Sequence, residues 1–337
     1  MIMQLLYDLS LMRPSSIWGR EVRRVAIKVR AVLSRCYDPI VKATIRGLPL
    51  YVHASNVNPI SYAEDFYDDQ PIPRIVRFVS ERKAGKLGLI DIGANVGFTA
   101  LIAHSVAPES DFLLIEGDPL SFELLERNTQ TIRNRRLEKV ILGESDEQVV
   151  GEFLQSGAGT ASFVEYGTVA VEGGGKTFIP QRVQHRKATL DSIARNMARV
   201  DYIKIDTDGA EPKILLGGKE TLTNHKPVVF CEFNPLGTVY KAFDADPMRI
   251  FALFQECGFE KYCFYDQGGK MILSADFGRE AHVFRGLTNY CMSAIGVMDV
   301  AVFHRESNDF EQFLQSETAY YQQVVDRFVA FRQWKRR

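Results

Sequence analysis

The sequence predicts an α/β fold in which a largely parallel sheet carries helices on both faces. Between about residue 85 and residue 305, short apolar runs typical of strands alternate with amphipathic segments typical of helices. The first of these runs leads directly into a glycine-rich turn, and open α/β sheets bind ligands at the carboxyl ends of their strands. The chain has 337 residues, of which 46% are hydrophobic and 25% charged, so it can build a full core.

Seven segments are expected to form strands, with five helices between them. The expected strands are 87–93, 111–117, 139–145, 201–206, 227–233, 261–266 and 297–304, and the expected helices are 98–106, 120–133, 189–197, 211–222 and 247–258. Crossovers between parallel strands should be right-handed. No clear helix joins the last two strands, so the last one is expected to enter the sheet as an antiparallel edge strand.

Two long segments interrupt this alternation. One covers about residues 147–186 and is rich in glycine and in β-type residues, and the other is the link 268–296. The first follows the carboxyl end of the third expected strand, and the second follows that of the sixth. Both are therefore expected to lie over the ligand-binding face, where lids and specificity loops belong.

Both ends of the chain are expected to be helical extensions, over residues 1–80 and 306–337. Residues 1–42 contain eight Lys or Arg and three Asp or Glu. A basic amphipathic helix there can lie on an anionic membrane or a partner, but we expect it to pack on the body by one face. Apolar residues recur at i, i+3, i+4 from Phe310 onward, which predicts one long helix ending in Lys335–Arg337. This helix is expected to pack with residues 1–42, beside the sheet or across a homodimer.

Composition and charge exclude several classes of protein. The formal net charge of −1 does not indicate a nucleic-acid partner. The five cysteines are an odd number with no CxxC pair, which is typical of reduced thiols in a cytoplasmic protein. We see no secretory signal. The most apolar window, 89–107, contains Asp91, Asn95 and His104, so we expect no transmembrane span.

The turn at 91–97 has the composition of a cofactor site. Its glycines allow a sharp turn and a close approach to a ligand. A dinucleotide site would have G-x-G-x-x-G, but here Gly97 follows Gly93 one residue too early for that pattern. Asp91, two residues before the first glycine, opposes a pyrophosphate and favours a cationic ligand, such as the ammonium of a methionine moiety. The alternative is a structural turn without a ligand.

Two further acidic residues suit a nucleoside. Glu116 ends the second strand and can accept hydrogen bonds from both ribose hydroxyls, as a carboxylate does in NAD sites too. Asp146 ends the third strand, where it could contact an adenine amino group. A plain turn aspartate is the alternative for Asp146.

Charged residues crowd the carboxyl end of the fourth strand. Lys204, Asp206, Asp208 and Glu211 lie within eight residues there, and Glu232 and Asn234 end the fifth strand. Asp208 and Glu211 also fit a helix capping box. Pro212 belongs in a first turn, and if the helix begins there, Asp208 lies outside it.

Several motifs together resemble the FkbM family of S-adenosylmethionine-dependent methyltransferases. They are DIGANVG at 91–97, LLIEGDP at 113–119 with Asn128 downstream, TLD at 189–191, and KIDTDGAEPKILLGG at 204–218 followed by PVVFCEF at 227–233. The resemblance covers about residues 86–305 and implies a methyltransferase domain over 81–305. It further implies a class I methyltransferase Rossmann-like sheet of order 3-2-1-4-5-7-6 with strand 7 antiparallel, and methyl transfer to oxygen on sugars, glycans or natural products. The implied S-adenosylmethionine-binding set is Asp91, Gly93, Asn95, Gly97, Glu116 and Asp146.

Methylation of a hydroxyl requires a group that removes its proton. Asp206, Glu211 and Glu232 are the candidate bases. Alternatively, Asp206, Asp208 and Glu232 could hold a divalent cation that acidifies the hydroxyl. We favour catalysis without a metal because no complete ligand set is evident, and His282 is the one histidine that merits a test. An NAD(P)-dependent oxidoreductase and a non-catalytic scaffold for partner binding are the alternative functions.

Overall fold

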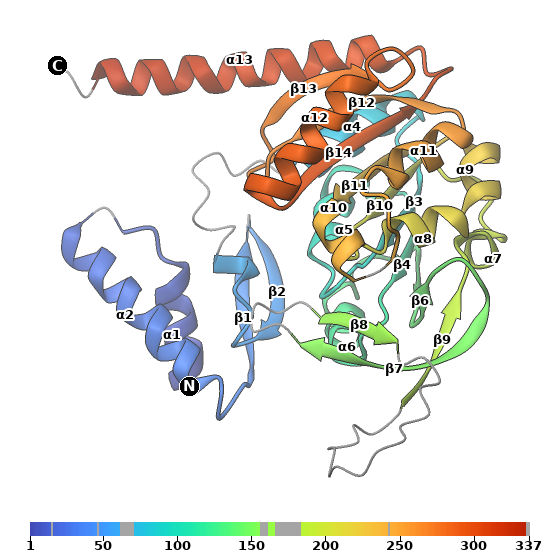
Figure 1. The fold of residues 1–337 in the computed structure, drawn as a ribbon. Coiled ribbons are helices and arrows are strands. Elements are labelled where there is room, and N and C mark those ends of the chain that lie inside the picture. Colours follow the sequence, from blue (N-terminus) through green and yellow to red (C-terminus); the bar gives the residue numbers. More distant parts are fainter. Residues whose placement is uncertain are drawn as a thin grey trace.

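The computed structural model describes residues 1–14, 16–45, 47–60, 71–155, 161–165, 183–241 and 243–334. An eight-stranded sheet lies at its centre (Figure 1). In order across the sheet, the strands are β13 (Met271–Asp276), β12 (Phe259–Tyr265), β14 (Met298–His304), β11 (Val228–Phe233), β10 (Tyr202–Ile205), β3 (Gly88–Ile92), β4 (Asp111–Ile115) and β5 (Arg135–Glu138). Neighbouring strands from β11 to β5 are parallel, whereas β14 is antiparallel to both β11 and β12. The α/β class is thus confirmed.

Two details of the sheet differ from the expectation. The last strand, β14, is antiparallel but lies between β11 and β12, as in the order that the family resemblance implies, and not at the edge; β13 from the link 268–296 forms the edge. The third strand is β5 rather than 139–145. Within 139–145 only β6 (Ile141–Leu142) is a strand, and it belongs to a second sheet. The apolar run was misleading because Val140 and Leu142 are buried in the core, while the polar strand β5 is half-buried at an edge.

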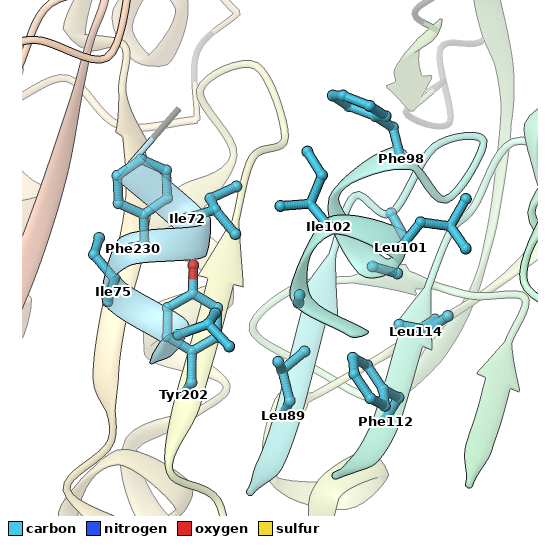
Figure 2. Close-up of a cluster of buried hydrophobic side chains, with 14 of the residues drawn as sticks. Ile72, Ile75, Leu89, Phe98, Leu101, Ile102, Phe112, Leu114, Tyr202 and Phe230 are labelled. Carbon is cyan, nitrogen blue, oxygen red and sulfur yellow. The ribbon is translucent and has the colours of Figure 1, made fainter. Parts of the chain in front are cut away.

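Each face of the sheet carries a hydrophobic cluster. Successive side chains of a strand point to opposite faces, so Leu89 and Ile90 belong to different clusters. Figure 2 shows the first cluster, in which sheet residues such as Tyr202 and Phe112 face α4 (Pro71–Arg82) and α5 (Phe98–Val106). Residues of α6 (Pro119–Asn128) join the same cluster. The second cluster includes α7 (Leu190–Ala194), α8 (Glu211–Leu216), α9 (Lys219–His225) and α11 (Arg249–Glu256).

The helix expected over 211–222 is in fact the pair α8 and α9. Gly217 and Gly218 separate them. A Cβ at Gly217 would lie 2.1 Å from the carbonyl oxygen of Gly143, so this glycine lets the backbone approach the neighbouring loop.

The two interrupting segments form secondary structure. The first builds a four-stranded sheet of order β6-β9-β7-β8, with β7 (Glu147–Gln155), β8 (Ala161–Glu165) and β9 (Val183–Ala188). Its residues 156–160 and 166–182 lie outside the described residues. The link 268–296 contains β13, α12 (Ala281–Tyr290) and the π-helix η1 (Cys291–Ile295). α10 (Pro235–Tyr240) follows β11.

The N-terminal extension is helical at its start. It begins with α1 (Ile2–Leu11), α2 (Ile17–Leu33) and an antiparallel hairpin of β1 (Ile40–Ile45) and β2 (Leu48–His53). Asn128 at the end of α6 connects this hairpin to the body. Its side chain accepts a hydrogen bond from the amide of Tyr51 at 2.8 Å and donates to the carbonyls of Tyr51 and Val96.

The C-terminal segment forms α13 (Phe310–Trp334), but its described contacts differ from the expectation. Phe313 packs on Phe78 of α4 and on Phe303 of β14, and Arg74 binds Glu317 at 2.7 Å. Figure 1 shows α13 along the top of the view, apart from α1 and α2. Packing with residues 1–42 of the same chain is therefore wrong, because Phe313 near the start of α13 packs on α4 and β14 instead, while packing across a homodimer stays a prediction. Lys335–Arg337 lies outside the described residues.

The five cysteines are free thiols; Cys36 is exposed and the other four are buried. Within the described part of the chain, none of the helices combines the length and the apolarity needed to cross a membrane.

Candidate active site

A cavity opens at the carboxyl ends of the central strands. Gly93, Glu116 and Asp206, which follow β3, β4 and β10, all line it. Parallel strands bring their carboxyl ends to one edge of a sheet, so the folding of three distant segments creates this site.

The glycine turn after β3 forms one wall. Gly93 has φ +71°, and a Cβ there would lie 2.0 Å from the carbonyl oxygen of Asp206. Asn95 also has a left-handed backbone, with φ +48°, which is uncommon for a residue other than glycine. Gly97, with φ +90°, begins α5 and does not line the cavity. The turn therefore places backbone close to the cavity at the cost of an unfavourable conformation at Asn95, as is frequent at functional sites.

Glu116 supports this turn from the end of β4. Its Oε2 accepts a hydrogen bond from the amide of Asn95 at 2.8 Å, and its Oε1 accepts one from the amide of Asp118 at 2.8 Å. Burial raises the pKa of Glu116 to about 7, although these two hydrogen bonds act in the opposite direction. Each carboxylate oxygen has a second lone pair, so Glu116 can also accept hydrogen bonds from a ligand.

Asp91 lies beneath the cavity rather than in its wall. Its side chain is buried and accepts a hydrogen bond from the hydroxyl of Thr99 at 2.5 Å. The ammonium of Lys204 lies 3.3 Å from Asp91 Oδ1 and 3.4 Å from Asp206 Oδ2. It also donates to the carbonyl of Gly93 at 2.8 Å. Burial lowers the pKa of Lys204, but the two carboxylates outweigh this effect and raise it overall.

Only one of the three candidate bases lines the cavity. Asp206 lines it, and its side chain is 52% exposed. Glu211 is buried and accepts hydrogen bonds from the amide and the hydroxyl of Thr207, both at 2.9 Å. It stabilises the turn after β10, and the helix α8 begins at Glu211, which leaves Asp208 outside it. The capping box of Asp208 and Glu211 is thus not formed.

Glu232 in β11 is half-buried and is absent from the cavity lining. Burial raises the pKa of Glu232 well above its ordinary value, and the carboxylates of Asp206 and Glu211 raise it further. Asn234 donates to Glu232 at 3.2 Å. A raised pKa favours the protonated form, which cannot take a proton from a hydroxyl, and Glu232 does not line the cavity, so this position suits a base less well than Asp206 does.

Asp146 has a structural role at the start of α7. It accepts hydrogen bonds from the amide and hydroxyl of Thr189, both at 3.1 Å, and from the hydroxyl of Ser192 at 2.7 Å. It is not among the residues that line the cavity. The neighbouring lining residues are apolar instead, namely Val140, Ile141 and Leu142.

The second sheet forms another wall, which agrees with the expectation that the first interrupting segment lies over the ligand-binding face. Phe153 and Phe163 line the cavity, with ring centroids 5.1 Å apart. Lys187 of β9 also lines it, 3.1 Å from Glu147 and 3.6 Å from Glu144. None of the described residues of the link 268–296 lines the cavity, so that link does not act as expected, and His282 is exposed. Instead, the link extends the edge of the central sheet, since its strand β13 pairs with β12.

The N-terminal extension contributes residues that the sequence analysis missed. Leu50 of β2 lines the cavity, together with Asn56, Asn58 and Pro59. Asn56 accepts a hydrogen bond from the amide of Asn58 at 2.9 Å, as in an Asx turn. The N-x-N-P spacing is a signal for such a turn, but nothing local indicates that it lies beside the glycine turn.

Charged groups are concentrated in the cavity. Among the described residues, no cluster of three or more His, Cys, Asp and Glu side chains has the arrangement that a metal ion needs. The cavity combines an apolar wall, carboxylates and a buried ammonium, which together suit an organic ligand with polar and cationic groups.

Comparisons with known proteins give the family. No curated relative matches this sequence. Among solved structures, the chain is similar to the methyltransferase FkbM from Methylobacillus flagellatus KT (11% identity, 74% of this chain, TM-score 0.34), and it spans about half (52%) of that protein. It is also similar to a precorrin-6y C5,15-methyltransferase from Geobacter metallireducens GS-15 (14% identity, 68% of this chain, 87% of that one, TM-score 0.34) and to M. jannaschii TYW2 in complex with AdoMet (10% identity, 79% of this chain, 86% of that one, TM-score 0.34).

Because these TM-scores are below 0.5, the assignment rests on the sequence match instead. The methyltransferase FkbM domain matches residues 91–261, which is half of the chain. The matched segment begins at Asp91 and contains β10 and β11 with the turns that line the cavity. The chain therefore belongs to the FkbM family of S-adenosylmethionine-dependent methyltransferases.

Proposed function

We propose that this protein is an O-methyltransferase that acts on a hydroxyl of a small-molecule or glycan acceptor, such as a sugar or a natural product. One observation carries the proposal. Asp206 is the exposed carboxylate at the carboxyl end of β10, it lines the cavity, and it lies next to the glycine turn. A carboxylate in this position can accept the proton of a hydroxyl as the oxygen gains a methyl group.

The residues around the glycine turn fit S-adenosylmethionine. At Gly93 a Cβ would collide with the carbonyl of Asp206, so glycine lets the turn after β3 pack directly against the end of β10, and both segments line the cavity. Glu116 would hold the ribose hydroxyls, and the apolar residues Val140, Ile141 and Leu142 suit the adenine ring. The bound cofactor supplies a methyl group on a sulfonium, which is a good leaving group. Asp91 supports the site through Lys204, since it does not reach the cavity.

The protein's own contribution is orientation and proton transfer. The ammonium of Lys204 contacts Asp206 at 3.4 Å and the carbonyl of Gly93 at 2.8 Å, so it links the proposed base to the cofactor turn. Asp208 and Lys241 line the cavity close to Asp206, where polar groups favour a hydroxylated acceptor. Positioning of this kind can supply a large part of a rate enhancement.

Transfer of a labelled methyl group to a panel of sugars, glycans, amines and carboxylic acids tests the proposal. We expect label on hydroxyl acceptors, and turnover about 10²–10⁴-fold slower in Asp206→Asn with unchanged cofactor affinity. EDTA should leave the activity intact. Label only on the amines or the carboxylic acids would refute methylation of a hydroxyl, and full activity of Asp206→Asn would refute the assigned base. Calorimetry that measures the affinity of the protein for S-adenosylmethionine and for NAD separates the methyltransferase from the oxidoreductase. The match to a methyltransferase family already argues against the oxidoreductase.

A further inference from the structure

The helix α2 turns an apolar stripe toward the solvent. Trp18, Val22, Val25, Val29 and Val32 follow one another at steps of four, three, four and three residues, which places them on one side of a helix. All five side chains are exposed, Trp18 at 83% and Val25 at 57%. We call these five residues the α2 stripe. Figure 1 shows α2 as the outermost element on its side of the molecule, with α1 between it and the β1–β2 hairpin.

The buried side of α2, which contains Ala26 and Arg30, holds the helix on the protein through polar contacts. Arg30 is 1% exposed, donates a hydrogen bond to the carbonyl of Ala54, and lies over the ring of Tyr7 at 5.5 Å. Arg23 donates to the carbonyl of Ser10 at 2.9 Å. A surface helix normally buries its apolar face and exposes its polar one. Here α2 has the reverse orientation, with its apolar stripe exposed. A rotation of the helix that buried the stripe would break the contacts of Arg30, so these contacts hold the stripe toward the solvent.

An apolar stripe of this size in water requires a partner, because its side chains gain free energy when they are covered. The charge around the stripe indicates which partner. Arg20, Arg24, Lys28 and Arg35 are exposed on the same helix or just after it. Residues 1–42 carry eight basic and three acidic side chains, whereas the whole chain has a net charge of −1. The positive charge is thus concentrated where the apolar stripe lies.

We propose that α2 docks this protein on the surface of an anionic lipid bilayer. The stripe would enter the boundary between headgroups and acyl chains, with Trp18 at the interface, and the basic residues would contact anionic headgroups. The helix lies on the surface, in keeping with the absence of a bilayer-spanning helix among the described residues. A second copy of the chain is a poorer partner, because pairing two α2 stripes would bring like charges together.

Docking would bring the cavity close to the membrane. Tyr7 of α1 donates to the carbonyl of Asn56 at 2.9 Å, and Asn56 lines the cavity. Through this contact and the β1–β2 hairpin, the docked helices connect directly to the site. Lipid binding itself is independent of the proposed methyl transfer.

Sedimentation of the full chain with lipid vesicles tests the proposal. We expect binding to phosphatidylcholine vesicles that contain about 30 mol% phosphatidylglycerol, little binding to phosphatidylcholine alone, and weaker binding as salt rises from about 0.1 M to about 0.5 M. In a Trp334→Phe background Trp18 is the sole tryptophan, so its emission should shift to shorter wavelength on anionic vesicles. Absence of binding to the anionic vesicles would overturn the proposal.

A matched pair of variants locates the contact. Val25→Asp combined with Val29→Asp should weaken vesicle binding about a hundredfold or more, because two valines no longer enter the bilayer. Val325→Asp, at an equally exposed valine of α13, should leave binding unchanged. Circular dichroism and thermal melting of both proteins show that they are folded. Equal binding of both variants would refute the role of α2, as would a dimer in analytical ultracentrifugation that the stripe variant dissociates.

Discussion

The ammonium of Lys204 lies 3.3 Å from the carboxylate of Asp91, and both side chains are buried; Lys204 lines the cavity, whereas Asp91 does not. The two residues occupy paired positions on the neighbouring strands β10 and β3. The ion pair therefore connects β3, which leads into the glycine turn, to β10, which leads into the candidate base Asp206. It explains why the carboxylate at position 91 is tolerated in the core, since a buried charge requires a partner of opposite sign.

Removal of Lys204 should destabilise the protein strongly. Lys204→Met leaves the carboxylate of Asp91 buried without its cation, which typically costs about 3–5 kcal/mol. Urea denaturation measures this loss. The double variant Lys204→Met, Asp91→Asn should recover part of it, because the unpaired charge is gone. A single variant as stable as the wild type would show that the pair contributes little.

Gly93→Ala should impair both stability and cofactor binding. The new Cβ would lie 2.0 Å from the carbonyl oxygen of Asp206, and the backbone has a positive φ. We expect a loss of about 1–3 kcal/mol in the free energy of unfolding and weakened binding of S-adenosylmethionine in calorimetry. Gly286→Ala is the control, since nothing lies within 4 Å of a Cβ there. Normal cofactor affinity in Gly93→Ala would contradict the placement of the turn.

Glu232→Gln should retain most of the activity. Glu232 does not line the cavity, and its raised pKa favours the neutral carboxyl, which glutamine resembles in charge and shape. Asp206→Asn serves as the comparison, with its expected decrease of about 10²–10⁴-fold in kcat. If Glu232→Gln were the slower enzyme, the base would have to be reassigned to Glu232.

Cofactor binding should strengthen as the pH rises through about 7. Because burial raises the pKa of Glu116 to about 7, its carboxyl is largely protonated at pH 6 and ionised at pH 8. The ionised carboxylate is the better acceptor for ribose hydroxyls. Calorimetry with S-adenosylmethionine at both values measures the effect. In Glu116→Gln the difference between the two pH values should shrink, and a difference equal to that of the wild type would assign it to another group.

The first half of α13 should be essential for the stability and solubility of the protein, and its second half should be dispensable for both. Deletion of residues 308–337 removes Phe310, Phe313 and Glu317, which are buried. Each lost aromatic core side chain typically costs about 3–5 kcal/mol, so we expect aggregation or loss of soluble protein. A chain that ends at Gln322 keeps these residues and should stay soluble with nearly the same melting temperature. A soluble 1–307 chain of normal stability would show that α13 is an appendage.

Much of the fold follows from local patterns. The expected helix 98–106 coincides with α5, and six of the seven expected strands overlap the strands of the central sheet. The exception is instructive. Val140 and Leu142 are apolar because they are buried in the second hydrophobic cluster, while the edge strand Arg135–Glu138 needs few apolar residues. An apolar run in the sequence indicates that the segment is buried, but it is weaker evidence that the segment is a strand.

By itself, the sequence determined the class of site. The spacing of Gly93 and Gly97, the carboxylate of Glu116 and the charged segment after Lys204 are local, because a turn and the end of a strand are encoded by a few consecutive residues. Tertiary structure alone decided which charges reach the cavity. Asp91 is buried against Lys204, Glu211 turns inward to bind Thr207, and Asp146 binds Thr189, so these three carboxylates do not line the cavity, whereas Glu116 and Asp206 do. The accessibility of a carboxylate depends on partners far away in the chain, and the approach of Asn56 to the glycine turn likewise exists only after folding.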